Sequence, residues 1–285
     1  MIRQTTGSVI CPSCHTLVGV NDERCYQCGR RNPGLWGFNP VLRRLGQDMG
    51  IGPFIIGTCV VLYALSLLLS RGNISMNGFG FLGPSLEAMF MLGSSGYVPV
   101  YTVGRWWTLL SAGWLHGGAL HILFNMMWVR QLMPAVVDLY GPGRAIIIYV
   151  LSSAVGFFLT STAFIFFGSL PIPPLSGATF SIGASASLFG LLGALVCYGQ
   201  RSGSSYISSQ AKGLALTMFI FGLVMPGVDN YAHAGGFVGG YVLARWMNPL
   251  KPERLDHIFI GLGLLLLCGL AILWSFISSL QYVLR

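Results

Sequence analysis

The stretches GASA at residues 183–186 and AHAGG at residues 232–236 place Ser185 and His233 inside two separate apolar segments of the chain. An ionisable side chain within an apolar membrane segment is energetically expensive, so His233 indicates a functional site. A serine hydroxyl becomes an effective nucleophile when a neighbouring base takes its proton. The pair therefore suggests nucleophilic catalysis if the fold brings the two side chains together.

The composition of the whole chain is that of a membrane protein. Of its 285 residues, 54% are hydrophobic and 8% are charged, whereas soluble domains contain about 25% charged residues. We expect an all-α integral membrane protein in the lipid bilayer, because seven apolar segments are near the length that crosses it. These segments cover residues 51–71, 117–137, 144–168, 183–200, 211–226, 231–248 and 257–281.

The distribution of basic residues predicts an orientation. If the N-terminus is cytoplasmic, only Arg71, Arg105 and Arg285 of the 16 Lys and Arg residues fall on the outer side, which matches the positive-inside rule. The N-terminus is polar and shows no cleavable signal peptide. We expect the plasma membrane of a prokaryote. The net charge of +8 is explained by this topology and by contact with anionic lipid, so no nucleic-acid partner is expected.

Four cysteines near the N-terminus form two CxxC pairs, CPSC at residues 11–14 and CYQC at residues 25–28. Two such pairs predict a structural zinc site with the ligands Cys11, Cys14, Cys25 and Cys28. Disulfides or an iron site are the alternatives, and disulfides are disfavoured in the reducing cytoplasm. A module of about 30 residues needs such a staple to fold. Its cytoplasmic partner is not identified by the sequence.

The chain divides into four expected parts. Residues 1–30 form the zinc-ribbon module, and residues 31–50 form a linker. Residues 51–248 form a six-helix transmembrane core, which residues 249–285 extend by one further C-terminal transmembrane helix.

The second apolar segment carries further polar side chains. His121 and Asn125 are four residues apart and therefore share one helix face, and His116 lies just before them. Histidine and asparagine can stabilise an oxyanion, although an asparagine in a helix bundle also commonly serves interhelical packing. Ser181 and Ser187 are alternative nucleophiles by residue type.

The topology predicts a common depth for the polar residues. With a cytoplasmic N-terminus, the second, fourth and sixth segments run from outside to inside. Asn125, Ser185 and His233 lie in the first halves of these segments. Because a helix rises by about 1.5 Å per residue, all three are expected at a similar shallow depth below the outer face.

These motifs closely resemble the rhomboid family of intramembrane serine proteases. The resemblance covers residues 51–248 and rests on His116, HILFN at residues 121–125, GAS at 183–185 and AHAGGFVGG at 232–240, in the family's order. The seventh segment resembles the additional C-terminal helix of some rhomboids. The zinc ribbon is an addition to the family's core.

The resemblance implies a Ser–His dyad that needs no cofactor. Ser185 would be the nucleophile and His233 the general base. The backbone N–H of Ser185 and the side chains of Asn125 and His121 would stabilise the oxyanion, and His116 would be a further site histidine. The expected activity is cleavage of transmembrane protein substrates near the outer membrane face. The alternative is a catalytically inactive rhomboid-like protein that binds membrane segments.

The resemblance has further implications for the surrounding structure. Phe189 would pack on the catalytic imidazole, and residues 72–105 would form the family's half-submerged loop. Ala186 replaces the glycine that usually follows the nucleophile, so its methyl group is expected to crowd the helix packing. The family's Trp-Arg pair reads Trp107-Thr108 here, which leaves the anchoring of the loop unexplained.

Overall fold

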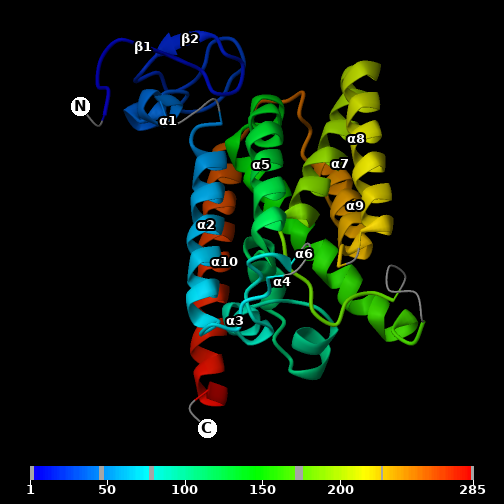
Figure 1. Cartoon of the computed structure of the whole chain (residues 1–285). Coiled ribbons are helices and arrows are strands. Elements are labelled where there is room, and N and C mark those ends of the chain that lie inside the picture. Colours follow the sequence, from blue (N-terminus) through cyan, green and yellow to red (C-terminus); the bar gives the residue numbers. More distant parts are fainter. Residues whose placement is uncertain (1–2, 45–47, 77–79, 171–175, 226, 284–285) are drawn as a thin grey trace.

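The computed structural model describes residues 3–44, 48–76, 80–170, 176–225 and 227–283 (Figure 1). Some predicted parts of the chain lie partly outside these residues. They include Pro226 at the end of the fifth apolar segment, Arg285 at the end of the C-terminal part, and residues 45–47 of the linker. The described part confirms the all-α membrane fold. It contains seven long helices, namely α2 (Ile51–Leu69), α5 (Ala119–Tyr140), α6 (Pro142–Phe167), α7 (Ser185–Ser202), α8 (Ser205–Val224), α9 (Asn230–Trp246) and α10 (Leu255–Val283).

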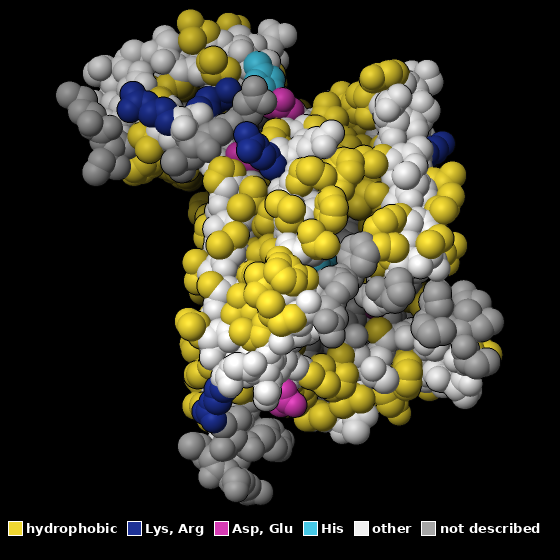
Figure 2. All heavy atoms as spheres, viewed as in Figure 1, with side chains coloured by type: hydrophobic (Ala, Val, Ile, Leu, Met, Phe, Trp, Pro, Cys, Tyr) yellow, Lys and Arg dark blue, Asp and Glu magenta, His cyan; other side chains and the backbone are white. Residues whose placement is uncertain are grey.

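Five of these helices, α2, α5, α6, α8 and α10, are long and apolar enough to cross a membrane by length and composition. Helices α7 and α9 are not among them, because α9 is only 17 residues long and α7, with 18 residues, contains many small and polar residues. Helix α7 is largely buried by its neighbours, whereas α9 packs one face against α6 and α7 and exposes Val238 and Trp246 on the other. Figure 2 shows hydrophobic side chains over the middle of the visible face and charged side chains toward the two ends.

Glycines bring α6, α7 and α9 into close contact at the centre of the bundle. A Cβ atom at Gly240 of α9 would clash with the backbone carbonyl of Gly190 in α7, and one at Gly236 would clash with that of Ala186. A Cβ atom at Gly235 would lie 2.9 Å from the Cα atom of Gly156 in α6. Small residues allow such backbone contact between membrane helices, so these glycines hold the helices that carry Ser185 and His233 together.

The connection between α2 and α5 contains short helices. Helix α3 (Leu86–Leu92) begins at Ser85, whose hydroxyl accepts a 3.2 Å hydrogen bond from the N–H of Ala88. A π-helical turn η3 (Val98–Thr102), helix α4 (Thr108–Ser111) and a 3-10 turn η4 (Ala112–Trp114) follow. Helices α3 and α4 both pack against α10.

The N-terminal module is a small ribbon with one antiparallel hairpin. Strands β1 (Ser8–Ile10) and β2 (Leu17–Gly19) pair Val9 with Val18. A 3-10 turn η1 (Leu35–Gly37) and helix α1 (Asn39–Arg44) follow the module. The side-chain amide of Asn39 donates a 2.7 Å hydrogen bond to the carbonyl of Ile10, so α1 is folded onto the ribbon.

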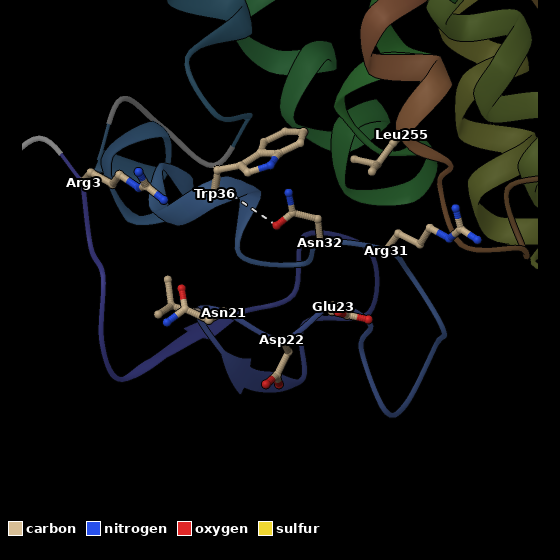
Figure 3. Close-up of a pocket in the computed structure, with 9 residues that line it drawn as sticks. Arg3, Asn21, Asp22, Glu23, Arg31, Asn32, Trp36 and Leu255 are labelled. Atoms are coloured by element: carbon tan, nitrogen blue, oxygen red, sulfur yellow. Dashed lines mark hydrogen bonds between the residues drawn. The ribbon is translucent and has the colours of Figure 1, made fainter.

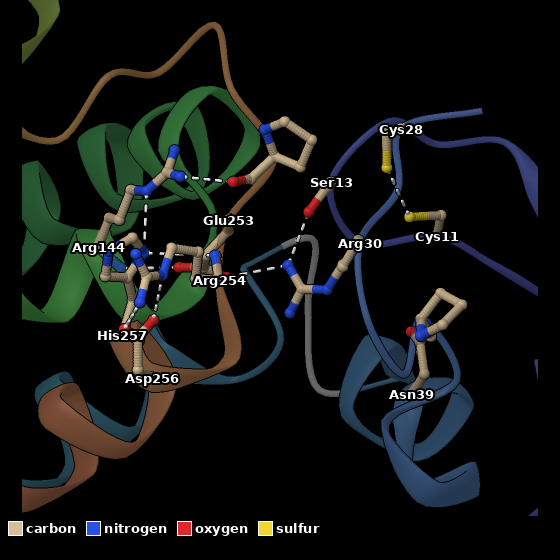
Figure 4. Close-up of polar contacts among 12 residues, drawn as sticks. Cys11, Ser13, Cys28, Arg30, Asn39, Arg144, Glu253, Arg254, Asp256 and His257 are labelled. Carbon is tan, nitrogen blue, oxygen red and sulfur yellow. Dashed lines mark hydrogen bonds and ion pairs between the residues drawn. The ribbon is translucent and has the colours of Figure 1, made fainter. Parts of the chain in front are cut away.

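A buried ion pair joins the ribbon to the membrane core. Nη1 of Arg30 lies 3.1 Å from Oε2 of Glu253, in the connection between α9 and α10, and both side chains are almost fully buried. Arg30 also donates to the hydroxyl of Ser13, and Oε1 of Glu253 accepts a 2.8 Å hydrogen bond from the N–H of Arg144 at the beginning of α6 (Figure 4). The ribbon therefore lies against the α5–α6 and α9–α10 connections.

Candidate active site

The ends of the helices determine where the site lies. Arg144 at the beginning of α6 donates hydrogen bonds to the carbonyls of Asn248, Lys251 and Pro252, so the ends of α5 and α9 meet at the ribbon. The side chain of Arg201 near the end of α7 bonds to the carbonyl of Arg245 near the end of α9. Helices α5, α7 and α9 therefore all begin on the side away from the ribbon.

Ser185 and His233 meet at the beginnings of two of these helices. Ser185 is the first residue of α7, and His233 lies in the first turn of α9. The Oγ atom of Ser185 lies 2.9 Å from Nε2 of His233, although the two residues are 48 positions apart in the sequence. This distance is that of a hydrogen bond between a nucleophile and its base.

Packing fixes the orientation of the His233 ring. The ring of Phe189, one turn after Ser185, stacks on the imidazole with a centroid distance of 4.3 Å and an interplanar angle of 15°. His233 is 6% exposed. Among the described residues, its Nδ1 atom has no hydrogen-bond partner, so the contacts seen here are those of a dyad.

The two other candidate serines have different surroundings. The hydroxyl of Ser187 is buried and has no hydrogen-bond partner in the described part of the chain. The hydroxyl of Ser181 donates a 2.6 Å hydrogen bond to the carboxylate of Asp229. Of the three serines, Ser185 is the one whose hydroxyl contacts an imidazole nitrogen.

His121 lies beside Ser185 because Gly183 leaves room for it. Gly183 has a φ of +123°, and a Cβ atom there would lie 2.7 Å from Nε2 of His121 and 3.8 Å from Oγ of Ser185. A side chain at this position would therefore be both strained and in collision with the imidazole. The N–H of Gly117 donates a 3.3 Å hydrogen bond to Nδ1 of His121, which directs Nε2 toward the site.

His116 and Asn125 surround His121. The rings of His116 and His121 pack edge to face with a centroid distance of 5.2 Å, and His116 is fully buried. The side-chain amide of Asn125 donates a 2.8 Å hydrogen bond to the carbonyl of His121. Within the described residues, both ring nitrogens of His116 and Oδ1 of Asn125 lack a partner. Buried polar atoms of this kind are normally satisfied by water or a ligand.

Space for the methyl group of Ala186 comes from the facing helix. A Cβ atom at Gly156 of α6 would lie 3.0 Å from the Cβ atom of Ala186, so the methyl group faces a position without a side chain. The crowding expected from this replacement is avoided, because the neighbouring helix supplies the glycine instead.

Arg105 anchors the loop that precedes α5. Its guanidinium donates hydrogen bonds to the carbonyl of Phe90 at 2.8 Å and to that of Ser275 at 2.9 Å, and it lies 4.2 Å above the ring of Phe90. The indole N–H of Trp107 donates to the hydroxyl of Ser275. The loop is therefore anchored by an arginine two positions before Trp107, and the anchor includes α10. The sequence motif alone did not indicate this contact.

The four N-terminal cysteines form a cluster that can hold a metal ion. Their sulfur atoms all lie within 4.8 Å of one another. The Sγ atoms of Cys11 and Cys28 are 3.8 Å apart, and those of Cys14 and Cys25 are 3.5 Å apart. Tetrahedral zinc with Zn–S bonds of about 2.3 Å places sulfur atoms about 3.8 Å apart. The donor set and the spacing therefore fit a four-thiolate metal site.

The turns of the two CxxC pairs have the same local structure. The N–H of His15 bonds to the carbonyl of Cys11, and the N–H of Gly29 bonds to that of Cys25. His15 and Gly29 both have a positive φ, of 60° and 72°. The positions after Cys14 and Cys28 are thus equivalent, and His15 is part of a turn.

A shallow hollow of about 390 Å³ lies away from the dyad. It is between the ribbon and the beginning of α10 (Figure 3), and its lining includes Arg3, Asp22, Glu23, Trp36 and Leu255. Neither Ser185 nor His233 contributes to it. The candidate active site is therefore assigned from the contacts between its polar side chains, and this hollow plays no part in the assignment.

A family model and several relatives match this chain. Residues 103–249, just over half of the chain, match the model of the Rhomboid domain. The chain is 32% identical over 182 residues to RHOMBOID-like protein 7 of Arabidopsis thaliana, which covers 60% of this chain and 53% of that protein. It is 28% identical over 179 residues to Rhomboid protease GluP of Bacillus subtilis (strain 168), which covers 62% of this chain and 33% of that protein.

A third relative has a different description. The chain is 28% identical over 162 residues to Inactive RHOMBOID-like protein 8 of Arabidopsis thaliana, covering 55% of this chain and 42% of that protein. The matches span about half or less of the length of these relatives. Together with the helical fold and the dyad geometry, the family match shows that this integral membrane protein belongs to the rhomboid family.

Proposed function

We propose that this protein is an intramembrane serine protease that hydrolyses transmembrane protein substrates by a Ser–His dyad. The observation that carries the proposal is the 2.9 Å contact between Oγ of Ser185 and Nε2 of His233. Two helices present this contact beneath a stacked aromatic ring.

The proposed chemistry proceeds through an acyl-enzyme. Nε2 of His233 takes the proton of the Ser185 hydroxyl while Oγ attacks the carbonyl carbon of the scissile peptide bond. The imidazolium then donates this proton to the leaving amine, and the C–N bond breaks. A water molecule, deprotonated by the same imidazole, hydrolyses the ester and restores the hydroxyl of Ser185.

The oxyanion of the tetrahedral intermediate needs nearby hydrogen-bond donors. Ser185 is the first residue of α7, where backbone N–H groups have no acceptor within the helix and the helix dipole is positive. Nε2 of His121 lies against Gly183, next to Ser185. We assign the Ser185 N–H, His121 and Asn125 to the oxyanion, with His116 supporting the ring of His121.

The substrate is proposed to be a transmembrane helix that is cut near the outer face. The dyad lies at the helix beginnings away from the ribbon, and the positive-inside rule assigns the ribbon to the cytoplasm. A substrate helix must unwind locally to expose its scissile carbonyl. Glycine and proline lower the cost of unwinding, so we expect cleavage near such residues.

An inactive, substrate-binding rhomboid is the alternative, and the relative named as inactive shows that the alternative is a realistic one. The retained contact between Ser185 and His233 favours the protease. A protein that only binds membrane segments has no need for a hydrogen-bonded nucleophile and base.

Labelling with a fluorophosphonate probe tests the proposal. The purified protein should react at Ser185 and cleave a generic transmembrane substrate in liposomes. Ser185→Ala and His233→Ala should each abolish cleavage, and the double variant should be no worse, because residues that act as one unit are not additive. Ser187→Ala is the matched control and should retain labelling. A well-folded wild-type protein that neither labels nor cleaves would support the inactive alternative.

For the cysteine cluster we propose structural zinc. Zinc bound by Cys11, Cys14, Cys25 and Cys28 would hold together a ribbon whose buried apolar core is small. It would take no part in hydrolysis, since the cluster lies at the opposite end of the helices from the dyad. The module's cytoplasmic partner remains a prediction.

The finer organisation also remains a proposal. We keep the division into a ribbon at 1–30, a linker at 31–50, a core at 51–248 and a further helix at 249–285. The prokaryotic plasma membrane stays a prediction, because the relatives include proteins of both Arabidopsis and Bacillus.

A further inference from the structure

A second hydrogen bond joins the segments that carry the dyad. Ser181 is four residues before Ser185, and Asp229 is four residues before His233. The hydroxyl of Ser181 donates to Oδ2 of Asp229 at 2.6 Å. At the end where α7 and α9 begin, the two segments are therefore connected by two side-chain hydrogen bonds, the dyad itself and this bond.

Asp229 also determines how α9 begins. It is the N-cap residue, and its Oδ1 atom accepts a 3.0 Å hydrogen bond from the N–H of Ala232. Its backbone carbonyl accepts a 3.1 Å hydrogen bond from the N–H of His233. The two carboxylate oxygens thus have separate partners, one inside α9 and one on the segment before α7.

Ser181 belongs to a segment that is held by backbone hydrogen bonds. Its N–H and carbonyl pair with the carbonyl and N–H of Ser95, at 2.8 and 3.0 Å. Two residues later, the N–H of Gly183 donates a 3.0 Å hydrogen bond to the carbonyl of Ala112. Ser181 is 5% exposed. The hydroxyl that reaches Asp229 therefore extends from a fixed part of the backbone.

Asp229 does not act as the third member of a triad in this arrangement. Its two oxygens are bonded to Ser181 and Ala232. Across the described ranges, Nδ1 of His233 has no hydrogen-bond partner. Any effect of Asp229 on the imidazole must pass through the position of α9.

We propose that Ser181 and Asp229 form a clasp that positions His233 against Ser185. The inference rests on the proposed proteolysis. The glycine contacts between α7 and α9 set how closely the helices approach, but they contain no directional bond that resists sliding or rotation. Directional bonds from Arg201 to the carbonyl of Arg245 and from Tyr241 to Gln200 lie toward the other ends of these helices. The clasp supplies such a bond one turn from the dyad. Because a displacement of 1 Å at a reacting group can lower a rate by about 10², the clasp determines how often the dyad is in a productive geometry.

Four variants separate the clasp from the helix cap. Ser181→Ala removes the clasp and leaves the cap. Asp229→Ser also leaves a cap, since serine is a good N-cap residue, but its single oxygen cannot serve both partners. Asp229→Asn keeps both contacts, because its carbonyl can cap Ala232 while its amide donates to Ser181. Asp229→Ala removes both.

The expected result is a loss of turnover without a loss of substrate binding. Ser181→Ala and Asp229→Ser should lower kcat by about tenfold, less than the roughly hundredfold cost of a 1 Å displacement, with KM within about twofold. Fluorophosphonate labelling of Ser185 should slow in parallel. The double variant Ser181→Ala/Asp229→Ser should match the single variants, since both remove one interaction. Asp229→Asn should stay within about threefold of the wild type.

The imidazole provides a readout that does not depend on activity. The chain has five histidines, and the ¹⁵N NMR signal of His233 can be assigned by its loss in His233→Ala. The signature of its bond to Ser185 should weaken in Ser181→Ala and persist in Asp229→Asn. This measurement tests the clasp even if the wild-type protein proves inactive, so failure of the clasp and failure of the proposed proteolysis are distinguishable.

Two outcomes would overturn the clasp. One is wild-type kcat and an unchanged His233 signal in both Ser181→Ala and Asp229→Ser. The other is a loss of kcat that follows thermal stability alone and is equally large in Asp229→Asn, which would assign Asp229 only a role in folding.

Discussion

A dyad between two helices needs few residues but strict placement. Ser185 and His233 each lie at a helix beginning, and the ring of Phe189 stacks on the imidazole. Glycine is required where the backbones or side chains approach most closely, as at Gly183 against His121 and at Gly240 against Gly190. Residues that look like ordinary membrane packing residues in the sequence therefore position the chemical groups.

The oxyanion assignment predicts the effect of Asn125→Ala. If Asn125 donates to the developing negative charge, turnover should fall by roughly 10²–10³-fold, as for a single oxyanion-hole donor in a soluble protease. The experiment measures kcat in liposomes, and thermal unfolding of the same variant shows whether it is still folded. Sharing of the role with His121 would reduce the loss. Unchanged turnover, or a loss explained by unfolding, would assign Asn125 to helix packing.

At the scale of elements, α10 braces the loop that precedes α5. Its residue Ser275 accepts from the side chains of both Arg105 and Trp107. A Cβ atom at Gly93, the C-cap of α3, would lie 2.5 Å from Oγ of Ser275. Helix α10 thus holds the loop before α5 in place through direct contacts with it.

This bracing predicts that Arg105→Ala loosens the loop. Hydrogen bonds to a charged group contribute about 1.5–3 kcal/mol, so the unfolding free energy should fall by about 2 kcal/mol or more. Thermal unfolding in detergent, together with limited proteolysis of residues 72–105, measures the change. Arg71→Ala, at an exposed arginine, is the matched control and should behave like the wild type. An unaffected Arg105→Ala variant would show that the brace contributes nothing.

At the scale of the whole molecule, the ribbon is predicted to depend on its metal. The purified protein should contain about one zinc per chain, which elemental analysis measures, because four thiolates close a tetrahedral site. Cys11→Ser should lose the metal and expose the ribbon to proteases. Its dyad should still react with a fluorophosphonate, since Ser185 and His233 lie at the far ends of the helices. Abundant iron, or no metal, would contradict the prediction.

The ion pair between ribbon and core makes a prediction that depends on pH. Burial raises the pKa of the Glu253 carboxyl, and Arg30 opposes the shift. Arg30→Ala leaves a buried charge without its partner, which costs about 3–5 kcal/mol. A carboxyl whose pKa is raised in the folded state contributes to the free energy of unfolding while it is protonated. This contribution is lost as the pH rises through the folded-state pKa. The variant should therefore be more destabilised at pH 8 than at pH 5.

A second substitution provides the control. Arg30→Ala/Glu253→Gln removes the charge while an amide oxygen can still accept from the N–H of Arg144. It should recover much of the stability and should lose the added pH dependence. Thermal unfolding and limited proteolysis across pH measure both effects. Equal stability of the single and double variants at pH 8 would show that the pair does not hold the ribbon.

The sequence by itself determined the membrane class, the seven helices and the residues proposed for the site. Hydropathy and helical spacing are local properties, so the seven long helices α2 and α5 to α10 are visible in them, whereas the short helices α3 and α4 are not. The CxxC spacing likewise predicted the cysteine cluster. The sequence also proposed Ser185 and His233, because an imidazole in an apolar segment is expensive and the motifs around both residues resemble those of the rhomboid family.

The resemblance predicted that Ser185 meets His233, but only the tertiary structure decided their distance and the other partners that such residues meet. Ser185 and His233 are 48 positions apart, as are Ser181 and Asp229, and Arg30 and Glu253 are 223 apart. Such contacts depend on how helices pack and leave no local pattern. The same holds for Ala186, whose methyl group fits because a glycine faces it from α6. A side chain's chemistry is set by its type, but its partners are set by the packing of distant segments.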